Sequence, residues 1–446
     1  MTMHRTRLHA APPRLSPAAA EAWIPRTCFK HGPPGRVGVE LELLVHDGRH
    51  PHLPTDGPAF DPLRAAARRT AVSGRVTVEP GGQIELSSSP HDGLPAVIAE
   101  VTGDLRRLRA LAAEHGAVLT GAGLDHRRVR RRVLADRRYA GMEAYLDRWG
   151  AAGRTMMRRT ASVQVNLEAS DGTPGDRERR WALLHAVGPA LVAAFANSPG
   201  APGGPWADWA SARMGVWLAL DPARTREPRR RSGENLEQAW ARTCLDAPLM
   251  LVRRPARSWV APPATFREWL DGGPDVVPGR PGPDLDDLAY HLTTLFPPVR
   301  PRGHLEVRYL DAQPDDWWAV PLAVLWALVT DRAAGDRALL ACTDQRAGWA
   351  EAARHGLRDD ALAAAAVALL DAAAGSLEAA SLDAAGGTAA CARLVRAYRD
   401  HWTARGRCPA DDRRDGVPVP PAPLEPPDPP EPPVALESLD RKDPPC

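Results

Sequence analysis

Lysine is almost absent from this chain of 446 residues and occurs only at Lys30 and Lys442. Arginine therefore supplies nearly all of the positive charge, and we interpret that excess as a coding bias rather than as a functional signal. Acidic and basic residues nearly cancel, which leaves a formal net charge of +2. A chain this close to neutral has no overall field that would attract a nucleic acid or a membrane surface. The composition therefore disfavours both classes of partner.

Paired cysteine motifs and long apolar runs are also missing. The six cysteines are scattered without C-x-x-C spacing, and no secretory leader opens the sequence, so we expect a reduced, cytoplasmic protein. No apolar run approaches the length of about 20 residues that a membrane-spanning helix needs. The sequence contains no G-x-x-x-x-G-K-[ST] motif and no G-x-G-x-x-G motif after a strand, which disfavours P-loop and Rossmann routes to a nucleotide.

Composition divides the chain into three parts. We expect residues 1–25 to be a weakly ordered lead-in with one short helix. Residues 26–405 should form one domain, whose Ala-rich part, 341–405, is helical because alanine has high helix propensity. Residues 406–446 are Pro-rich and have almost no apolar periodicity, so we expect a disordered tail.

Hydrophobic periodicity predicts a mixture of strands and helices. The predicted strands are Val37–Val45, Arg75–Ser88, Ala117–Gly121, Thr160–Glu168 and His304–Leu310. The predicted helices are Leu94–Glu114, Arg179–Ala196, Ala207–Leu220, Asn235–Asp246, Leu285–Leu295, Asp315–Arg332 and much of Trp349–Arg399. The strands are spaced too irregularly for a doubly wound array, so the predicted class is α+β, with helices packed against the back of one sheet.

Four of the predicted strands share an unusual polar face. Residues i and i+2 of a strand point the same way. The residues that therefore share a face are Glu40 and Glu42 in the first strand; Glu79, Gln83 and Glu85 in the second; Ser162, Gln164 and Asn166 in the third; and Glu306 and Arg308 in the fourth. Any one of these strands, taken alone, is better explained as an ordinary amphipathic strand with one solvated face.

The four faces together point to a binding site. Solvent faces of this protein should carry mostly arginine, yet three of the four carry Glu, Gln, Asn, Ser and Gly instead. Clustered carboxylates repel one another unless a cation lies among them, and a hard divalent cation with oxygen ligands resolves that repulsion. Mg²⁺ held by a few carboxylates is typical of phosphate chemistry. The tripeptide Pro80–Gly82 is interpreted as a turn or bulge that leads into its strand.

Five motifs in order carry a resemblance to a known family: "GVELELL", "EPGGQIELSSSP", "RRTASVQVNLE", "ARMGVWLALDPARTR" and "RPRGHLEVRYLDAQP". Over roughly Cys28–Leu340 the chain resembles the plant-type, second-class glutamate-cysteine ligases, in particular the actinobacterial members that serve ergothioneine biosynthesis. The resemblance implies a glutamine-synthetase-like carboxylate-amine ligase fold, in which a curved, mainly antiparallel sheet has the active site in its concave face. It also implies an ATP- and Mg²⁺-dependent reaction that joins the γ-carboxylate of L-glutamate to the amine of L-cysteine through γ-glutamyl phosphate.

The same resemblance assigns roles to individual residues. The implied metal ligands are Glu40, Glu42, Glu79, Glu85 and Glu306. The implied residues that bind substrate or ATP are Ser162, Gln164, Asn166, Gln83, Arg213 and Arg308. The implied catalytic residues are Arg308, Arg213, Arg224 and Asp221. Replacing Glu85 or Glu306 by Ala should abolish turnover with little loss of folding, because both glutamates face the site rather than the core.

Several alternatives stay open at this stage. The acceptor could be another amino acid or a polyamine, with selectivity set by loops such as Asn197–Asp208, or the chain could bind a nucleotide or amino acid without catalysis. The sequence leaves the oligomeric state open, a monomer included. The basic run His126–Tyr139 is better explained as a solvated surface than as a phosphate-binding patch. His126 and His304 are interpreted as structural, and Trp217 is more often core than pocket wall.

Overall fold

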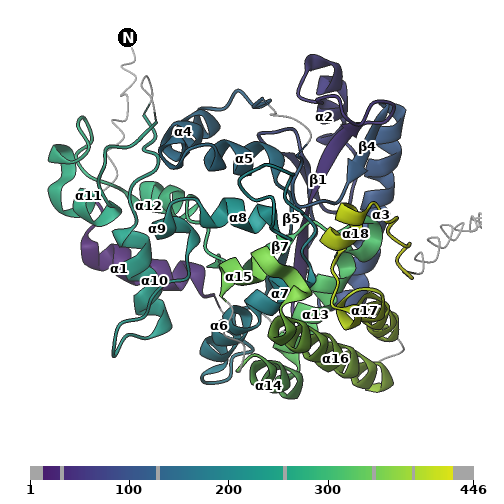
Figure 1. Cartoon of the computed structure of the whole chain (residues 1–446). Coiled ribbons are helices and arrows are strands. Elements are labelled where there is room, and N and C mark those ends of the chain that lie inside the picture. The colour runs from purple at the N-terminus through teal and green to yellow at the C-terminus, as the bar shows by residue number, and fades with distance from the viewer. Residues whose placement is uncertain are drawn as a thin grey trace, which may run out of the picture.

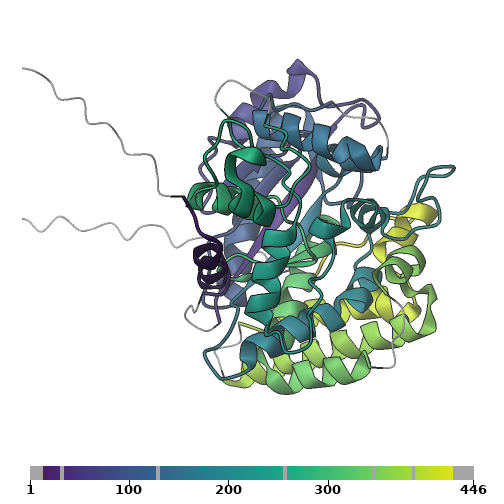
Figure 2. The same ribbon diagram turned by 90° about the vertical axis from the view of Figure 1, so that its left-hand side faces the viewer.

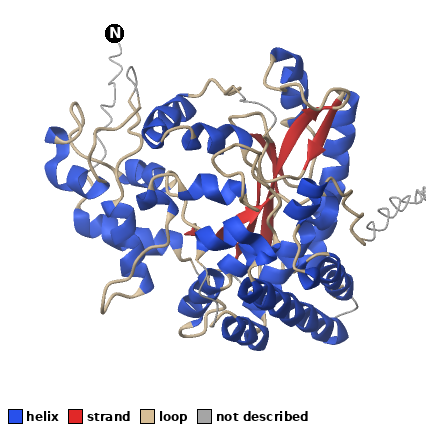
Figure 3. Cartoon of the chain, in the orientation of Figure 1, coloured by secondary structure: helices blue, strands red, loops and turns tan. Residues whose placement is uncertain are grey.

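The computed structural model describes residues 14–30, 35–126, 131–254, 259–343, 348–383 and 387–424. One seven-stranded sheet lies among helices (Figure 1) and is seen as the red layer in Figure 3. Its strands are β1 (Val37–Asp47), β2 (Arg75–Val78), β3 (Ile84–Ser87), β4 (Ala117–Thr120), β5 (Ser162–Leu167), β6 (Val299–Pro301) and β7 (Leu305–Asp311). The strand order is β2-β3-β1-β5-β7-β6, with β4 also paired to β1, and every pair is antiparallel. The predicted α+β class and the antiparallel sheet are therefore confirmed.

Helices surround this sheet. In the N-terminal half they are α1 (Pro17–Cys28), α2 (Asp61–Ala67), α3 (Leu94–Glu114), α4 (Arg137–Leu146), α5 (Ala152–Arg159), α6 (Asp176–Ala186), α7 (Gly188–Ala194), α8 (Ala212–Leu218) and α9 (Pro222–Thr225). In the C-terminal half they are α10 (Leu236–Asp246), α11 (Phe266–Gly272), α12 (Leu285–Leu292), α13 (Ala319–Thr330), α14 (Arg332–Ala341), α15 (Trp349–His355), α16 (Asp360–Asp383), α17 (Ala389–His401) and α18 (Pro409–Asp415).

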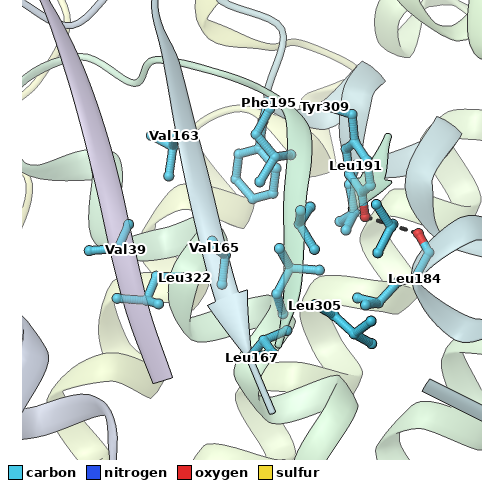
Figure 4. Packing of buried hydrophobic residues seen from close by; sticks show 14 of the residues in the cluster. Val39, Val163, Val165, Leu167, Leu184, Leu191, Phe195, Leu305, Tyr309 and Leu322 are labelled. Carbon is cyan, nitrogen blue, oxygen red and sulfur yellow. Dashed lines mark hydrogen bonds between the residues drawn. The ribbon is translucent and has the colours of Figure 1, made fainter. Parts of the chain in front are cut away.

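The apolar residues of the central strands face the main core. Val39 of β1 and Val165 of β5 pack near Leu322 of α13, as Figure 4 shows. In the same view Tyr309 of β7 donates its hydroxyl to the Leu184 carbonyl of α6 at 3.1 Å. This one-sided burial is what an alternating strand achieves when helices cover only its apolar face. The opposite face of the same strands is left for polar side chains.

A layer of C-terminal helices covers the far side of that core. In Figure 2 the light-green helices lie along the bottom of the molecule, with the yellow helices beside them at the right. One stretch among them, Asp360–Ser381 of α16, is long and apolar enough to cross a membrane by length and composition alone. This differs from the expectation that no apolar run is that long. The stretch packs against α7, α13, α14 and α17, which is the position of a core helix.

Both predicted domain boundaries fall inside packed structure. The boundary after residue 25 cuts α1, whose Ala20 and Ile24 are fully buried. The predicted tail is also wrong over residues 406–424, because α18 and the segment after it lie on the domain. There the Trp317 indole donates to the Pro420 carbonyl at 2.8 Å. Residues 1–13 and 425–446 lie outside the described residues.

The structure confirms more of the predicted helices and strands than of the residues at which they were predicted to begin and end. Helix α3 has the predicted bounds, Leu94–Glu114. The predicted strand Arg75–Ser88 is instead a hairpin, β2 and β3, whose turn contains the expected Pro80–Gly82 segment. The predicted helix Arg179–Ala196 is divided between α6 and α7. Strand β6 was not predicted, because three residues are too few to show a period.

Candidate active site

The antiparallel register brings the predicted polar residues together on one face of the sheet. Glu42 lies opposite Glu85 across β1 and β3, and Glu40 lies opposite Gln164 across β1 and β5. Asn166 lies opposite Glu306 across β5 and β7. Cross-strand partners share a face, so the prediction that four strands contribute to one polar surface is confirmed for β1, β3, β5 and β7.

Glu79 reaches the same surface from a turn rather than from a strand. The turn between β2 and β3 is closed by backbone hydrogen bonds from Glu79 to Gln83 at 2.8 Å and from Gly82 to Glu79 at 2.9 Å. Gly82 has a φ of +89°, which favours glycine. A Cβ at Gly81 would lie 2.1 Å from the Arg158 carbonyl oxygen, so only glycine lets the turn approach α5 this closely. The turn thereby carries Glu79 toward α5.

Short polar side chains donate to the carboxylates of this surface. Ser162 Oγ donates to Glu42 Oε2 at 2.9 Å, and Asn166 Nδ2 donates to Glu40 Oε1 at 3.2 Å. Thr77 Oγ1 donates to Glu85 Oε1 at 2.8 Å. Gln164 is shared, because its Nε2 donates to Glu42 at 3.3 Å while its Oε1 accepts from Arg308. The amide and hydroxyl groups therefore hold the carboxylates in place.

The carboxylates nevertheless favour protonation at this surface. Burial, reinforced by the charges of Glu306 and Glu85, raises the pKa of Glu40 to about 7. Burial and neighbouring carboxylates also raise the pKa of Glu79 well above its usual value and raise the pKa of Glu85. Burial raises the pKa of Glu42, although Arg213 and Ser162 oppose that shift. Buried like charges raise one another's pKa in this way when no cation lies among them.

The donor chemistry of these four glutamates fits Mg²⁺, which prefers carboxylate oxygens and shares its coordination with substrate phosphates. A closed ligand set is not preformed, however. Within the ranges that the structure describes, no group of three His, Cys, Asp or Glu side chains is arranged to hold a metal ion. The residues present therefore supply the oxygens for a divalent cation without a finished coordination shell.

Glu306 has a different environment from the other glutamates. It is fully buried, and its carboxylate accepts from Arg300 Nη2 at 2.9 Å, from Arg308 Nη1 at 3.0 Å and from Arg302 Nη1 at 3.4 Å. Burial alone would raise its pKa, but these guanidinium groups outweigh burial and hold the pKa well below its usual range. A carboxylate surrounded by guanidinium groups is not the environment expected of a metal ligand. In this structure Glu306 therefore acts as an anchor for arginines, and its predicted role as a metal ligand stays a prediction.

Two residues of this surface were missed from the sequence. Arg300 lies on β6 opposite Glu306 and is buried. Asp311 lies at the end of β7 opposite Ser162, although regular alternation would place it on the core face with Tyr309. The register shifts between Val163 and Val165 of β5, so β7 carries an extra residue there, which is a β-bulge. The bulge turns Asp311 onto the polar side.

A cavity of about 170 Å³ lies between this surface and helices α4, α5 and α8. Its polar side includes Glu42, Glu79, Gln83, Ser162, Arg213 and Arg308. Its apolar side includes Tyr139, Met142, Met156, Met157, Trp217 and Phe296. The apolar side belongs to a second hydrophobic cluster, separate from the main core. Sequence patterns missed these residues because apolar helix faces look the same whether they cover a core or a cavity.

Several buried N–H groups that line the cavity have no hydrogen-bond partner. They are Arg213 Nε and Nη1, Arg308 Nε and Trp217 Nε1. The Trp217 ring lies 5.8 Å from the Arg308 guanidinium, so Trp217 walls the cavity rather than filling a core. Buried donors without partners are costly, so these N–H groups are available to an anionic group. Gln83 Oε1 is likewise buried without a partner.

Arg224 and Asp221 do not line this cavity, so its geometry gives no support to their predicted role as site residues. Arg224 Nε donates to Asp221 Oδ2 at 3.1 Å and Nη1 donates to Thr294 Oγ1 at 2.7 Å, while Nη2 donates to the Pro248 carbonyl. All three nitrogens are therefore engaged within the protein. Tyr145 completes the cluster by donating to Asp221 at 2.7 Å. The arrangement ties three segments of the fold together.

The basic run His126–Tyr139 contributes more to the site than predicted, although its residues 127–130 lie outside the described ranges. Arg138 and Tyr139 line the cavity, and burial raises the pKa of Tyr139 to about 12. His126 lines a separate surface groove together with part of the loop Asn197–Asp208. That loop does not line the cavity, so the predicted control of acceptor choice by this loop has no support in the geometry.

The chain is similar to known proteins over most of its length. The family profile "Glutamate-cysteine ligase family 2(GCS2)" matches residues 36–422, which extends beyond the predicted resemblance and includes α18. The chain is 40% identical to glutamate–cysteine ligase EgtA of Mycolicibacterium smegmatis over 78% of this chain and 82% of that protein. It is 39% identical to EgtA of Mycobacterium tuberculosis over 90% of both chains.

More distant relatives include a chloroplastic glutamate–cysteine ligase of Arabidopsis thaliana, which is 33% identical over 64% of this chain and 53% of that protein. A crystal structure of the Francisella tularensis glutamate–cysteine ligase in complex with AMP aligns with a TM-score of 0.44 at 14% identity, over 87% of this chain and 94% of that one. That structural likeness is too weak to support an argument, whereas the profile match and the EgtA identities are extensive. The chain belongs to glutamate-cysteine ligase family 2.

Proposed function

We propose that this enzyme is an ATP-dependent ligase that joins the γ-carboxylate of L-glutamate to the amine of L-cysteine and releases γ-glutamylcysteine, ADP and phosphate. Family membership supports the reaction class. The observation that carries the assignment to this site is the set of unpartnered N–H groups of Arg213, Arg308 and Trp217, which face Glu42 and Glu79 across one small cavity. Such donors fit the carboxylates of glutamate or the transferred phosphoryl group.

The first step makes the carboxylate reactive. An oxygen of the γ-carboxylate attacks the γ-phosphorus of ATP, the bond to the β-γ bridging oxygen breaks, and ADP leaves. The product is γ-glutamyl phosphate, which has a good leaving group. Arg308 is suited to this step because Glu306 and Gln164 fix its guanidinium while Nε stays available. A planar guanidinium can bind a carboxylate or a phosphoryl group with two donors.

The second step forms the amide bond. The cysteine nitrogen attacks the γ-carbonyl carbon, phosphate leaves, and the nitrogen loses a proton. Arg213 is suited to hold the glutamate during this attack, because it is buried, lines the cavity and has no hydrogen-bond partner at Nε, while its Nη1 lies 3.8 Å from Asp311. Ser162, Gln83 and Asn166 would position substrate or carboxylates through their short polar groups. Closure of the cavity by apolar side chains would keep water from hydrolysing the acyl phosphate.

The glutamates would hold the metal that this chemistry needs. Mg²⁺, when bound, neutralises charge on the triphosphate and on the phosphoryl group during transfer. We assign Glu40, Glu42, Glu79 and Glu85 to that task, because these carboxylates lie close enough to raise one another's pKa and, among the described residues, form no ion pair with an arginine. Glu306 instead fixes Arg300 and Arg308 beside them. This division gives each charged group of the surface a defined partner.

The pathway and the compartment follow from the same relationship. The resemblance to actinobacterial ligases of ergothioneine biosynthesis, and the EgtA relatives, support supply of γ-glutamylcysteine to that pathway. Use of ATP, glutamate and a reduced thiol supports a cytoplasmic location. The expected partners are these small molecules.

The test is an assay of ADP release by the purified protein with ATP, Mg²⁺, glutamate and a panel of amines. Release should depend on both glutamate and cysteine, and Glu85→Gln should abolish it. Release that is independent of cysteine, or that is faster with a different amine, would overturn the assignment of the acceptor. A variant that keeps wild-type rates without Glu85 would overturn the assignment of the metal site.

A further inference from the structure

Asp311 and helix α18 do not line the cavity, and neither has a role in the reaction described above. Asp311 is buried and lies 3.8 Å from Arg213 Nη1. Its carboxylate accepts from the Asn197 backbone N–H at 2.8 Å, from Ser198 Oγ at 2.6 Å and from Ser211 Oγ at 2.9 Å. These three donors hold the carboxylate in place without any contribution from the Arg213 guanidinium.

The hydroxyl groups that hold Asp311 also hold the start of helix α8. Ser211 Oγ accepts from the Met214 backbone N–H at 3.2 Å and caps the helix. Ser198 Oγ accepts from the Arg213 backbone N–H at 3.1 Å. The Asp311 carboxylate is therefore linked both to the charge of Arg213 and to the backbone that carries Arg213. On its other side, Arg213 Nη2 donates to the Arg308 carbonyl at 2.9 Å.

Helix α18 extends this network to the C-terminal part of the chain. Arg413 donates from Nε to Asn197 Oδ1 and from Nη2 to the Gly121 carbonyl at 2.8 Å. Asn197 is fully buried, and its Nδ2 donates to the carbonyls of Gly121 and Ala312 at 3.0 and 2.6 Å. The backbone of Ala410 also donates to Ala196 at 2.9 Å. The helix thus clamps the residue whose N–H holds Asp311.

The backbone at Gly123 lies close against the Asp311 carboxylate. A Cβ at Gly123 would lie 2.6 Å from Asp311 Cγ. The glycine therefore allows a close approach that a larger residue would prevent. The bulge in β7 brings the carboxylate to this position, and the glycine admits it.

We propose that Asp311 is a positioning residue for Arg213, and that Arg413 of α18 holds Asp311 in place through Asn197. This inference rests on the proposed role of Arg213 in binding glutamate. It gives the C-terminal helix a part in substrate affinity, although none of its residues lines the cavity. Outer contacts that orient metal ligands commonly change affinity by about 10- to 100-fold, and we expect the lower end of that range for a carboxylate that orients a binding guanidinium.

The test uses steady-state kinetics of the full chain with each substrate varied in turn. Asp311→Asn keeps the shape and removes the charge, and it should raise the KM for glutamate about tenfold while the KM for ATP stays within about twofold. Arg413→Ala should have a smaller effect of the same kind, and Arg413→Lys should restore part of it. Arg414→Ala is the matched control, because Arg414 lies on the same helix, is exposed and pairs with the neighbouring Asp411. This variant should leave the KM values for glutamate, cysteine and ATP unchanged.

The outcomes separate this inference from the proposed function. If the wild-type protein shows no glutamate-dependent ADP release, the proposed function fails. If the wild type is active but Arg413→Ala lowers only the melting temperature, with the KM for glutamate unchanged, helix α18 is merely structural and the inference fails. If Asp311→Asn does not fold, Gly123→Ala replaces it, since the added methyl displaces the carboxylate without removing a polar group; an unchanged KM for glutamate in that variant also overturns the inference.

Discussion

Replacing Glu306 by Ala should destabilise the protein, in contrast to the expectation from sequence that this change leaves folding intact. The side chain is fully buried, and its removal leaves Arg300 buried without the carboxylate that accepts two of its N–H groups. Removing one partner of a buried ion pair costs about 3–5 kcal/mol, because the other charge stays buried and uncompensated. An unfolding entropy of ~0.9 kcal/mol/K for a chain of this length converts that loss to about 3–5 °C in melting temperature.

Thermal and urea unfolding of matched variants would measure this effect. Glu85→Ala is the control, because Glu85 faces the same surface but is raised in pKa by burial and by neighbouring carboxylates. Removing Glu85 relieves repulsion, so its melting temperature should equal or exceed that of the wild type, although activity is lost. The double variant Glu306→Leu with Arg300→Met should recover part of the stability, since a buried pair can be replaced by apolar residues at little cost.

The pH dependence gives an independent check of the same reasoning. The pKa of Glu306 is depressed in the folded state, so its contribution to stability is present above the ordinary carboxyl pKa and is lost as the pH falls through the folded value. The gap between the wild type and Glu306→Ala should therefore be full at pH 7 and should shrink in strong acid. Equal melting temperatures for Glu306→Ala, Glu85→Ala and the wild type at pH 7 would refute the assignment of Glu306 as an arginine anchor.

Three further predictions follow from the fold. Saturating Mg²⁺ should raise the melting temperature of the wild type and should have little effect on the Glu40→Gln, Glu85→Gln double variant; equal shifts in differential scanning fluorimetry would contradict the metal assignment. His291 is buried, contacts the Cys244 carbonyl at 2.8 Å, and has a pKa lowered by burial to about 3. Below pH ~6.5 the unfolded chain binds a proton that the folded chain excludes, so the free energy of unfolding should decrease by up to ~1.4 kcal/mol for each unit that the pH falls. His291→Gln should flatten this dependence on pH in urea titrations. A chain ending at Gly406 should lose several degrees of melting temperature because it lacks helix α18, with its bonds to Asn197 and Trp402, as well as the Trp317–Pro420 contact, whereas a chain ending at Leu424 should match the wild type.

The polar surface of the sheet could be predicted from sequence because a strand has a period of two. Alternation in four segments placed Glu40, Glu42, Gln164 and Asn166 on one face, and the register confirms that placement. A β-bulge interrupts the alternation of side chains between the two faces of a strand, so alternation alone gave Asp311 no role. Alternation also does not show which carboxylate pairs with arginines, because that depends on Arg300, which lies on a strand of only three residues, too short to recognise.

The apolar side of the cavity and the ends of the domain escaped prediction for a different reason. Met142, Met156 and Trp217 have the pattern of any apolar helix face, and only the packing of α4, α5 and α8 over the polar surface leaves a space beside them. The segment after residue 405 has a Pro-rich composition that suggests disorder. Its contacts with Asn197 and Trp317 join residues far apart in sequence, which composition does not report.

The extra residue in β7 has a consequence for transplanting this site onto another protein. An ideal strand that carried Glu306, Arg308 and Asp311 at their native spacing would point the last of them into the hydrophobic interior. A designer would have to copy the irregular strand together with Gly123, which makes room for the displaced carboxylate. Searches that compare strands by strict alternation would also fail to group these three residues, so related sites in other proteins should be sought by cross-strand register instead.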